Sequence, residues 1–249
     1  MHIDLNADLG EGGAFDHELL ALVSSANISC GAHAGDTDTI NNAIRLAVTH
    51  NVRIGAHPSY PDRVNFGRLP MQLSFSSLRQ HVLSQLESLR ELVGTQHGQL
   101  SHIKPHGALY NQLAIDEALA QNFTDIVKEF DSALPVVGLA GGVFLRVAKE
   151  AGLQTYSEAF ADRRYQPNGE LVPRSDSQAL IHDVDVAVAQ SLAIISKGEI
   201  KTITGETIPI NADTLCVHGD SVIALQFAKK LHQRFVQEGI RITAFSREY

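Results

Sequence analysis

The sequence predicts an α/β fold in which a parallel sheet closes into a β/α barrel. Short apolar runs rich in β-branched residues alternate with longer segments of helical periodicity, as is typical of parallel strands joined by crossover helices. The 249 residues contain no linker, repeat or break in composition, so residues 1–249 are expected to form a single barrel domain. The pattern alone does not decide between seven and eight barrel strands.

Eight segments have the strand pattern: residues 3–8, 26–31, 53–57, 101–105, 135–140, 155–160, 215–218 and 241–245. Seven segments between them have the helix pattern: residues 14–23, 38–50, 75–93, 116–130, 142–151, 184–197 and 220–238. Asp36 and Asp220 are expected to cap the helices that follow them. Glycines at positions 94, 152, 198 and 239 are expected to end helices, because glycine readily adopts the left-handed conformation found there.

Three segments interrupt this rhythm. Residues 58–73 and 162–178 are rich in proline, glycine and charge, and are expected to be long functional loops. Residues 201–210 consist of two alternating runs around Gly205 and Glu206, and predict a short hairpin.

The composition excludes several classes of function. The formal net charge is −8, with no basic run, so nucleic acid is not an expected partner. No apolar run reaches the roughly 18–20 residues needed to cross a bilayer, and the first residues lack the apolar core of a signal peptide. A cytoplasmic protein is therefore expected. Cys30 and Cys216 are interpreted as small core residues at strand ends, without a disulfide.

Ionisable side chains follow or end most of the predicted strands. These residues are Asp8, His33, His57, Lys104, His106, Glu158 and His218. The carboxyl ends of the strands of a parallel barrel meet at one face, where the loops build the active site. We therefore expect these side chains to share one site.

Such a cluster suits acid–base catalysis by Asp and His, stabilisation of an anion by Lys104 or Arg68, or a divalent metal held by Asp and two His. No HxxxH or HExxH motif supports the metal, although ligands from separate strands would not show that spacing. No GxxxxGK[ST] motif for a nucleotide is present.

Seven motifs spread over nearly the whole chain resemble those of the LamB/YcsF family. They are residues 4–11 (DLNADLGE), 27–36 (NISCGAHAGD), 54–62 (IGAHPSYPD), 66–68 (FGR), 104–111 (KPHGALYN), 172–174 (VPR) and 216–220 (CVHGD). The resemblance implies an irregular seven-stranded parallel β/α barrel, similar to the barrel of metal-dependent polysaccharide deacetylases. It also implies the A component of an ATP-dependent 5-oxoprolinase, which acts with subunits B and C to hydrolyse 5-oxoproline to glutamate.

On this basis we expect Asp8, with His57 or His106, to perform acid–base catalysis. Lys104 and Arg68 are expected to hold a phosphoryl group or the substrate carboxylate. Further candidates for substrate or phosphate binding are Asn6, His33 and Glu158.

Two alternatives remain open. The chain could be a metal-dependent amide or acetyl hydrolase that acts alone, with Asp8, His57 and His106 as the metal ligands. It could also be a non-catalytic component that binds the substrate for its partners.

Overall fold

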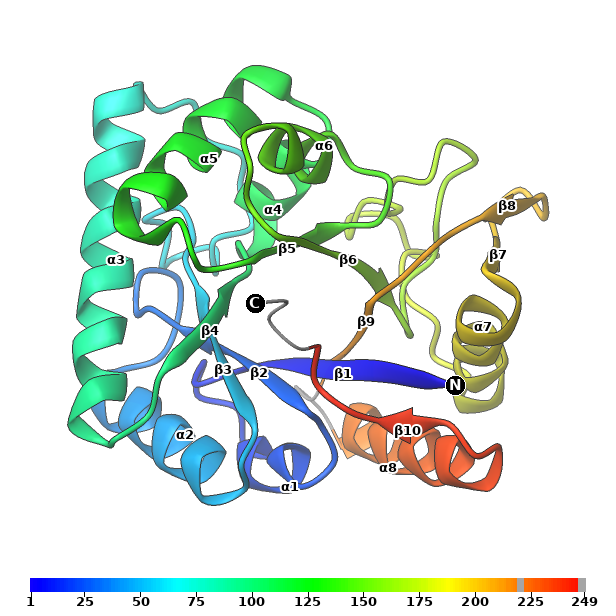
Figure 1. Ribbon diagram of the computed structural model, residues 1–249. Helices are drawn as coiled ribbons and strands as arrows, with labels where there is room; N and C mark the ends of the chain where they lie inside the picture. The colour runs from blue at the N-terminus through cyan, green and yellow to red at the C-terminus, as the bar shows by residue number, and fades with distance from the viewer. Residues whose placement is uncertain (219–221, 246–249) are drawn as a thin grey trace.

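Seven parallel strands form a closed barrel in this computed structural model, which describes residues 1–218 and 222–245 (Figure 1). The barrel strands are β1 (His2–Leu9), β2 (Ser25–Ser29), β3 (Arg53–His57), β4 (Leu100–Ile103), β5 (Val136–Leu139), β6 (Thr155–Phe160) and β9 (Thr214–Val217). They pair in that order, and β9 closes the ring because it pairs with both β6 and β1. The predicted parallel barrel is confirmed, with seven strands.

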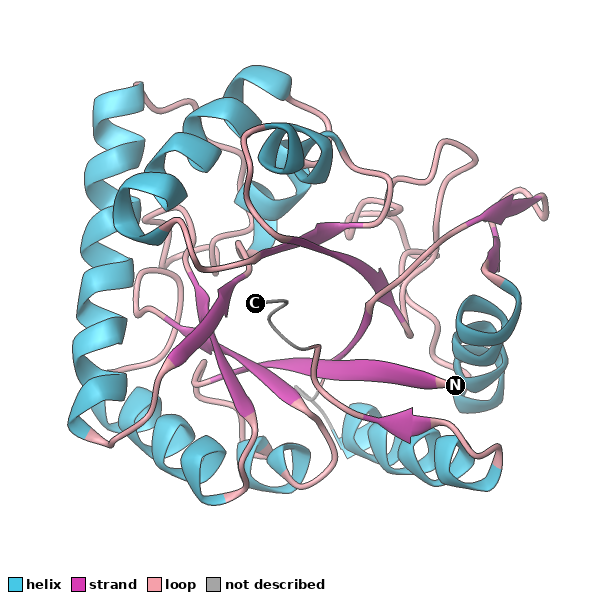
Figure 2. Ribbon diagram, viewed as in Figure 1, coloured by secondary structure: helices cyan, strands magenta, loops and turns pink. Residues whose placement is uncertain are grey.

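Helices surround the barrel on the outside (Figure 2). They are α1 (Asp16–Leu20), α2 (Thr37–Thr49), α3 (Phe75–Thr95), α4 (Gly107–Leu113), α5 (Glu117–Asp131), α6 (Val143–Glu150), α7 (Val184–Lys197) and α8 (Val222–Gln237). The carboxylate of Asp36 accepts a hydrogen bond from the backbone N–H of Thr39, which confirms the predicted cap of α2. The equivalent prediction for Asp220 lies outside the described residues.

The structure corrects the predicted elements at four places. The predicted strand at residues 241–245 is only β10 (Arg241–Ile242), which pairs with the start of β1 and stays outside the ring. Gly94 does not end its helix, because α3 continues to Thr95. Helix α4 was not predicted, since its seven residues are too few to show a periodicity. The predicted hairpin is formed by β7 (Glu199–Lys201) and β8 (Thr207–Pro209). Its strands are shorter than expected, and the hairpin begins at residue 199 instead of residue 201.

The interior of the barrel is polar along part of its length. Asp4 and Asn6 on β1, Asn27 on β2, His102 on β4 and Glu158 on β6 are at most 2% exposed. The imidazole of His102 fits inside because Gly55 has no side chain, and a Cβ atom there would lie 2.1 Å from the ring. Hydrogen bonds connect these buried groups, so the barrel interior is a polar network beneath the site rather than an apolar core.

Neither cysteine is in a disulfide: Cys216 is buried inside the barrel and Cys30 is partly buried. Among residues 1–218 and 222–245, no helix has both the length and the apolar character that a membrane span requires.

Candidate functional site

A cavity of about 470 Å³ opens where the strands end, and several predicted site residues line it. Asp8, His57, Lys104, His106 and Arg68 all contribute to its wall. The remaining predicted residues (Asn6, His33 and Glu158) are buried behind the wall and contact the residues that line it. The barrel thus brings together side chains that are as far apart in sequence as Asp8 and Lys104.

Lys104 is 2% exposed and lies at the bottom of the cavity. Its Nζ atom is 2.8 Å from Oε1 of Glu158, 3.0 Å from Oδ1 of Asp8 and 3.2 Å from Oδ1 of Asn6. The thiol sulfur of Cys216 lies 3.4 Å away. An ammonium group has three protons to donate, so these four acceptors use all of them. Lys104 is therefore committed to the protein, which disfavours the predicted role of holding a phosphoryl group or a carboxylate of the substrate.

The charges of Lys104 and Asp8 stabilise each other. Burial alone would lower the pKa of Lys104, but Asp8, Cys216 and Glu158 raise it well above its usual value. Burial alone would raise the pKa of Asp8, but His57 and Lys104 lower it well below its usual value. Asp8 is thus an ionised carboxylate at the cavity wall, held in position by a buried cation.

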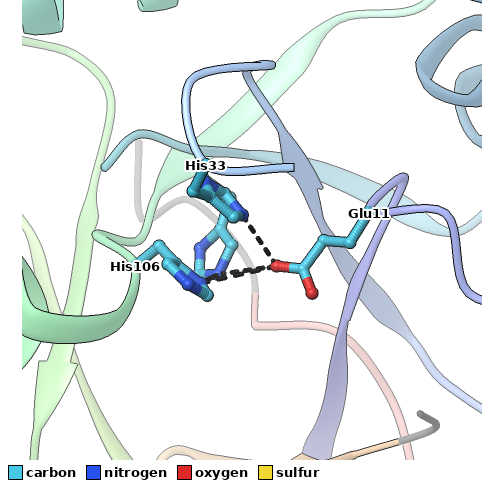
Figure 3. A group of neighbouring side chains, drawn as sticks. Glu11, His33 and His106 are labelled. Atoms are coloured by element: carbon cyan, nitrogen blue, oxygen red, sulfur yellow. Dashed lines mark hydrogen bonds and ion pairs between the residues drawn. The ribbon is translucent and has the colours of Figure 1, made fainter. Parts of the chain in front are cut away.

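Three histidines and one glutamate form a compact cluster beside this pair. Their ligand atoms lie within 4.8 Å of one another; the residues are Glu11, His33, His57 and His106. Figure 3 shows the Glu11 carboxylate pointing toward the rings of His33 and His106. Oε1 of Glu11 is 2.9 Å from Nε2 of His33, 3.4 Å from Nδ1 of His106 and 3.9 Å from Nε2 of His57. Each residue lies at the end of a different strand or follows it, from β1 to β4.

The second nitrogen of each imidazole is held by an acceptor of the protein. Nδ1 of His57 donates to the Lys104 carbonyl at 2.7 Å, and Nε2 of His106 donates to the Phe66 carbonyl at 2.9 Å. Nδ1 of His33 lies 2.9 Å from the Ser59 hydroxyl, which itself donates to the Tyr60 carbonyl and so accepts from the ring. In neutral rings these bonds leave the inward-facing nitrogens without protons.

The inward-facing lone pairs require positive charge between them. Nε2 of His57 and Nδ1 of His106 are only 2.9 Å apart, which needs a shared proton or a cation. Burial lowers the pKa of His33 to about 3 and that of His106 well below its usual value, so both rings stay neutral. Burial likewise opposes protonation of His57, but Asp8 raises its pKa, so His57 carries the shared proton. The set of three imidazoles and one carboxylate is a ligand set that zinc and similar divalent metals prefer.

A tight contact between the loop after β3 and the first residues of α4 supports His106. Gly107 has φ +57°, and a Cβ atom there would lie 2.5 Å from the carbonyl oxygen of Gly67. That carbonyl accepts a hydrogen bond from the backbone N–H of Ala108 at 2.9 Å. Only glycine permits this approach, which places the neighbouring Phe66 carbonyl against His106.

The cluster differs in composition from the ligand set expected for a metal, which was Asp8, His57 and His106. His57 and His106 belong to the cluster, whereas Asp8 is bonded to Lys104 and lies at its border, 3.3 Å from Nε2 of His57. Glu11 was missed, and His33 was assigned to the substrate. Glu11 stands in a glycine-rich turn, GEGG, where its direction cannot be inferred from a strand pattern.

Comparisons with known proteins agree with the geometry. The family model described as LamB/YcsF matches residues 3–249. The chain belongs to the LamB/YcsF family. A solved relative is the lactam utilization protein from Thermus thermophilus, with 39% identity and a TM-score of 0.91. The match covers 98% of this LamB/YcsF chain and 100% of that protein.

More distant structures share the fold of this LamB/YcsF protein. A putative cellobiose-phosphate cleavage protein from Enterococcus faecalis V583 has 10% identity and a TM-score of 0.56, over 97% of this chain and 96% of that one. The family 4 carbohydrate esterase from Streptomyces lividans, solved with acetate, has 12% identity and a TM-score of 0.50, over 99% and 93% of the two chains. The expected likeness to the deacetylase barrel is confirmed for the fold, which two solved deacetylases share at TM-scores of 0.51.

A second group of polar residues forms the cavity wall near the ends of β6 and β9. Nδ1 of His218 donates to the Asp162 carboxylate at 2.8 Å, and Nε2 of His218 accepts from Nη2 of Arg174 at 2.8 Å. Arg163, which also lines the cavity, donates from Nη2 to the Val172 carbonyl at 2.7 Å. In this LamB/YcsF chain the cavity thus has an acidic, histidine-rich side and a side that carries two arginines.

Proposed function

We propose that this protein hydrolyses the amide bond of a lactam, and that its substrate is 5-oxoproline, which opens to glutamate. The observation that carries the proposal is the ionised Asp8 carboxylate, fixed by buried Lys104, at the edge of a cavity next to the Glu11–His cluster. The 39% identical lactam utilization protein supports a lactam as the substrate class.

The resistance of the substrate explains why such a site is needed. An amide loses its resonance when water adds to the carbonyl, so the reaction requires a proton acceptor for the water and stabilisation of the developing oxyanion. Asp8 lines the cavity and can receive that proton at Oδ2, while Oδ1 stays bonded to Lys104. Lys104 is a positioning residue, because its ammonium group keeps Asp8 ionised and holds the carboxylate in its orientation.

A divalent metal fits the cluster. Several lone pairs face one another in the cluster and need positive charge between them. Nε2 of His57 lies 2.9 Å from Nδ1 of His106, and Oε1 of Glu11 lies 2.9 Å from Nε2 of His33. Glu11, His33, His57 and His106 would hold the metal, and each imidazole has the outer acceptor that metal-binding histidines usually have. A bound metal would supply Lewis acidity for the carbonyl oxygen and acidify water.

ATP and two partners, the B and C subunits, complete the proposal, with this chain as the A component of the complex. ATP would transfer its γ-phosphoryl group to the lactam oxygen, which releases ADP and removes the amide resonance. Water would then add to that carbon, the ring C–N bond would break as the nitrogen takes up a proton, and hydrolysis of the resulting acyl phosphate would give glutamate and phosphate. The family resemblance is the support for ATP and for the two partners. The sequence itself has no GxxxxGK[ST] motif for a nucleotide.

The test is reconstitution of the three chains, measuring glutamate formed from 5-oxoproline with and without ATP. Asp8→Asn is expected to reduce the rate by about 10²-fold or more, since it removes the proton acceptor. Asp125→Asn is a matched control on the exposed side of α5, with the same change of charge. Wild-type rates in Asp8→Asn, or no glutamate from the unaltered complex, would refute the proposal.

A second function is favoured by the metal-type cluster and the shared deacetylase-like fold: a metal-dependent amide hydrolase that acts alone. Metal analysis of the purified chain, followed by assay without ATP or partners, separates the two. Stoichiometric metal together with hydrolysis by the single chain would favour this second function.

A further inference from the structure

The arginine side of the cavity carries positive charge that the protein does not neutralise by direct ion pairing. Arg163 and Arg174 both line the cavity, and among residues 1–218 and 222–245 neither has an acidic group within 4.0 Å. Burial lowers the pKa of Arg163 to about 10, and the charge of Arg174 acts in the same direction. Nε of Arg163 is buried and has no hydrogen-bond partner within the described part of the chain.

Asp162 compensates this charge only in part. Its carboxylate accepts from Nδ1 of His218, and the neutral imidazole then accepts from Arg174. Burial opposes ionisation of Asp162, but His218 and the two arginines lower its pKa. One carboxylate against two guanidiniums leaves a net charge of about +1, which suits a monoanion.

The other cations of the cavity are engaged elsewhere. Lys104 donates all its protons to acceptors of the protein, as described above. Arg68 comes from the loop after β3, and its guanidinium lies 4.9 Å from the ring of Phe66. Among the residues that the structure describes, the guanidinium of Arg174 makes one hydrogen bond, from Nη2 to His218, so its other donors can form a bidentate pair with a carboxylate.

We infer that Arg174, supported by the charge of Arg163, binds an anionic group of the substrate and selects lactams that carry a carboxylate. This inference rests on the proposed lactam hydrolysis and deepens it. Asp8 and the Glu11–His cluster lie at the ends of β1–β4, whereas Arg163 and Arg174 follow β6, across the ring from β2 and β3. His218, which accepts from Arg174, follows β9, between β6 and β1. A substrate whose carboxylate is held by Arg174 therefore presents its other side, the lactam carbonyl, to the acidic and histidine-rich wall.

The experiment compares 5-oxoproline with its uncharged amide, 5-oxoprolinamide, by calorimetric binding to the reconstituted complex without nucleotide. Arg174→Gln is expected to weaken 5-oxoproline binding by about 10- to 100-fold, and binding of the amide by less than about three-fold. Arg174→Lys should fall between, because lysine keeps the charge but not the fork. Arg164→Gln is the matched control, because it removes the same charge from the same loop at a residue that does not line the cavity.

The outcomes separate this inference from the proposed function. If the unaltered complex binds neither lactam and forms no glutamate, the proposed function fails and the inference falls with it. If the unaltered complex prefers 5-oxoproline and Arg174→Gln keeps that preference, only the inference is overturned. Loss of the preference in Arg68→Gln but not in Arg174→Gln would also overturn it and assign the carboxylate to Arg68. Circular dichroism and metal content of each variant check that the fold and the cluster are retained.

Discussion

Replacement of Lys104 by methionine should convert a buried ion pair into a pH-dependent defect. Lys104 lies 2.8 Å from Glu158, whose side chain is 0% exposed, and it is the only cation within 4.0 Å of that carboxylate in the described part of the chain. Asp8 keeps a second partner, His57. The variant therefore leaves Glu158 as the buried carboxylate without a counter-charge, and such a group takes up a proton instead of remaining ionised.

The size of the defect follows from the cost of that proton. An ordinary glutamate has a pKa of about 4.3, so keeping one protonated at pH 7 costs about 3.7 kcal/mol. This agrees with the roughly 3–5 kcal/mol lost when one partner of a buried ion pair is removed. In the variant the folded state binds one more proton than the unfolded chain. The free energy of unfolding, relative to wild type, should therefore decrease by about 1.4 kcal/mol per unit as the pH rises from 5 to 7.

Urea unfolding at pH 5, 6 and 7, with a chelator present throughout, measures this difference. The double variant Lys104→Met/Glu158→Gln should lose this slope relative to wild type, because the carboxylate of residue 158 is no longer there to protonate. Lys149→Met, an exposed lysine on α6, should have almost no effect. A Lys104→Met protein as stable as wild type at pH 7, or a slope that persists in the double variant, would refute the reasoning.

Three further predictions concern other parts of the barrel. Burial raises the pKa of Asp4 to about 6, so the folded state binds a proton more tightly than the unfolded chain; this stabilisation is complete below about pH 4 and is lost as the pH rises through 6. Asp4→Asn should remove that decline, which amounts to about 2.4 kcal/mol between pH 4 and 7 in urea unfolding, and an unchanged pH profile would contradict this prediction. Gly107→Ala should destabilise the fold by at least about 1–2 kcal/mol, because a Cβ atom there would meet the Gly67 carbonyl. Gly94→Ala, inside α3 with open space around it, should stabilise the fold by about 0.5–1 kcal/mol. Equal effects of the two variants in thermal unfolding would count against the close contact between Gly107 and Gly67. Zinc at 100 times its dissociation constant should raise the free energy of unfolding by about 2.7 kcal/mol. Zinc binding should also release protons from the His57–His106 and His33–Glu11 contacts. Calorimetry in buffers of different ionisation enthalpy measures that release, and binding without it would contradict the prediction.

The sequence predicted the architecture well because the signals are local. Alternation of short apolar runs with helical periodicity defines each strand and helix, and the number of barrel strands was settled only by pairing. Residues 241–245 have the composition of a strand, yet β10 pairs only with the first residues of β1, since β9 occupies the rest of that edge. Such competition for one edge is not encoded in either segment alone.

The site was predictable in position more than in detail. Asp8, His57, Lys104 and His106 were expected at one mouth of the barrel because they end or follow parallel strands. Their partners could not be inferred, because the donors of Lys104 are used by groups on three other strands: Asn6, Glu158 and Cys216. Glu11 was missed since a turn, not a strand, sets its direction. Arg174 lies in a long irregular loop, so only the coordinates bring it to His218.

The late position of β9 has a consequence for biosynthesis. As the chain leaves the ribosome, the first six barrel strands are available long before β9, because residues 161–213 come between them. Until β9 inserts between β6 and β1, water can reach Asp4, Asn6, Glu158 and Lys104, and their charges need no protein partner. The nascent protein therefore avoids the desolvation cost of these groups until its last barrel strand is made, and ring closure and dehydration of the interior become one event.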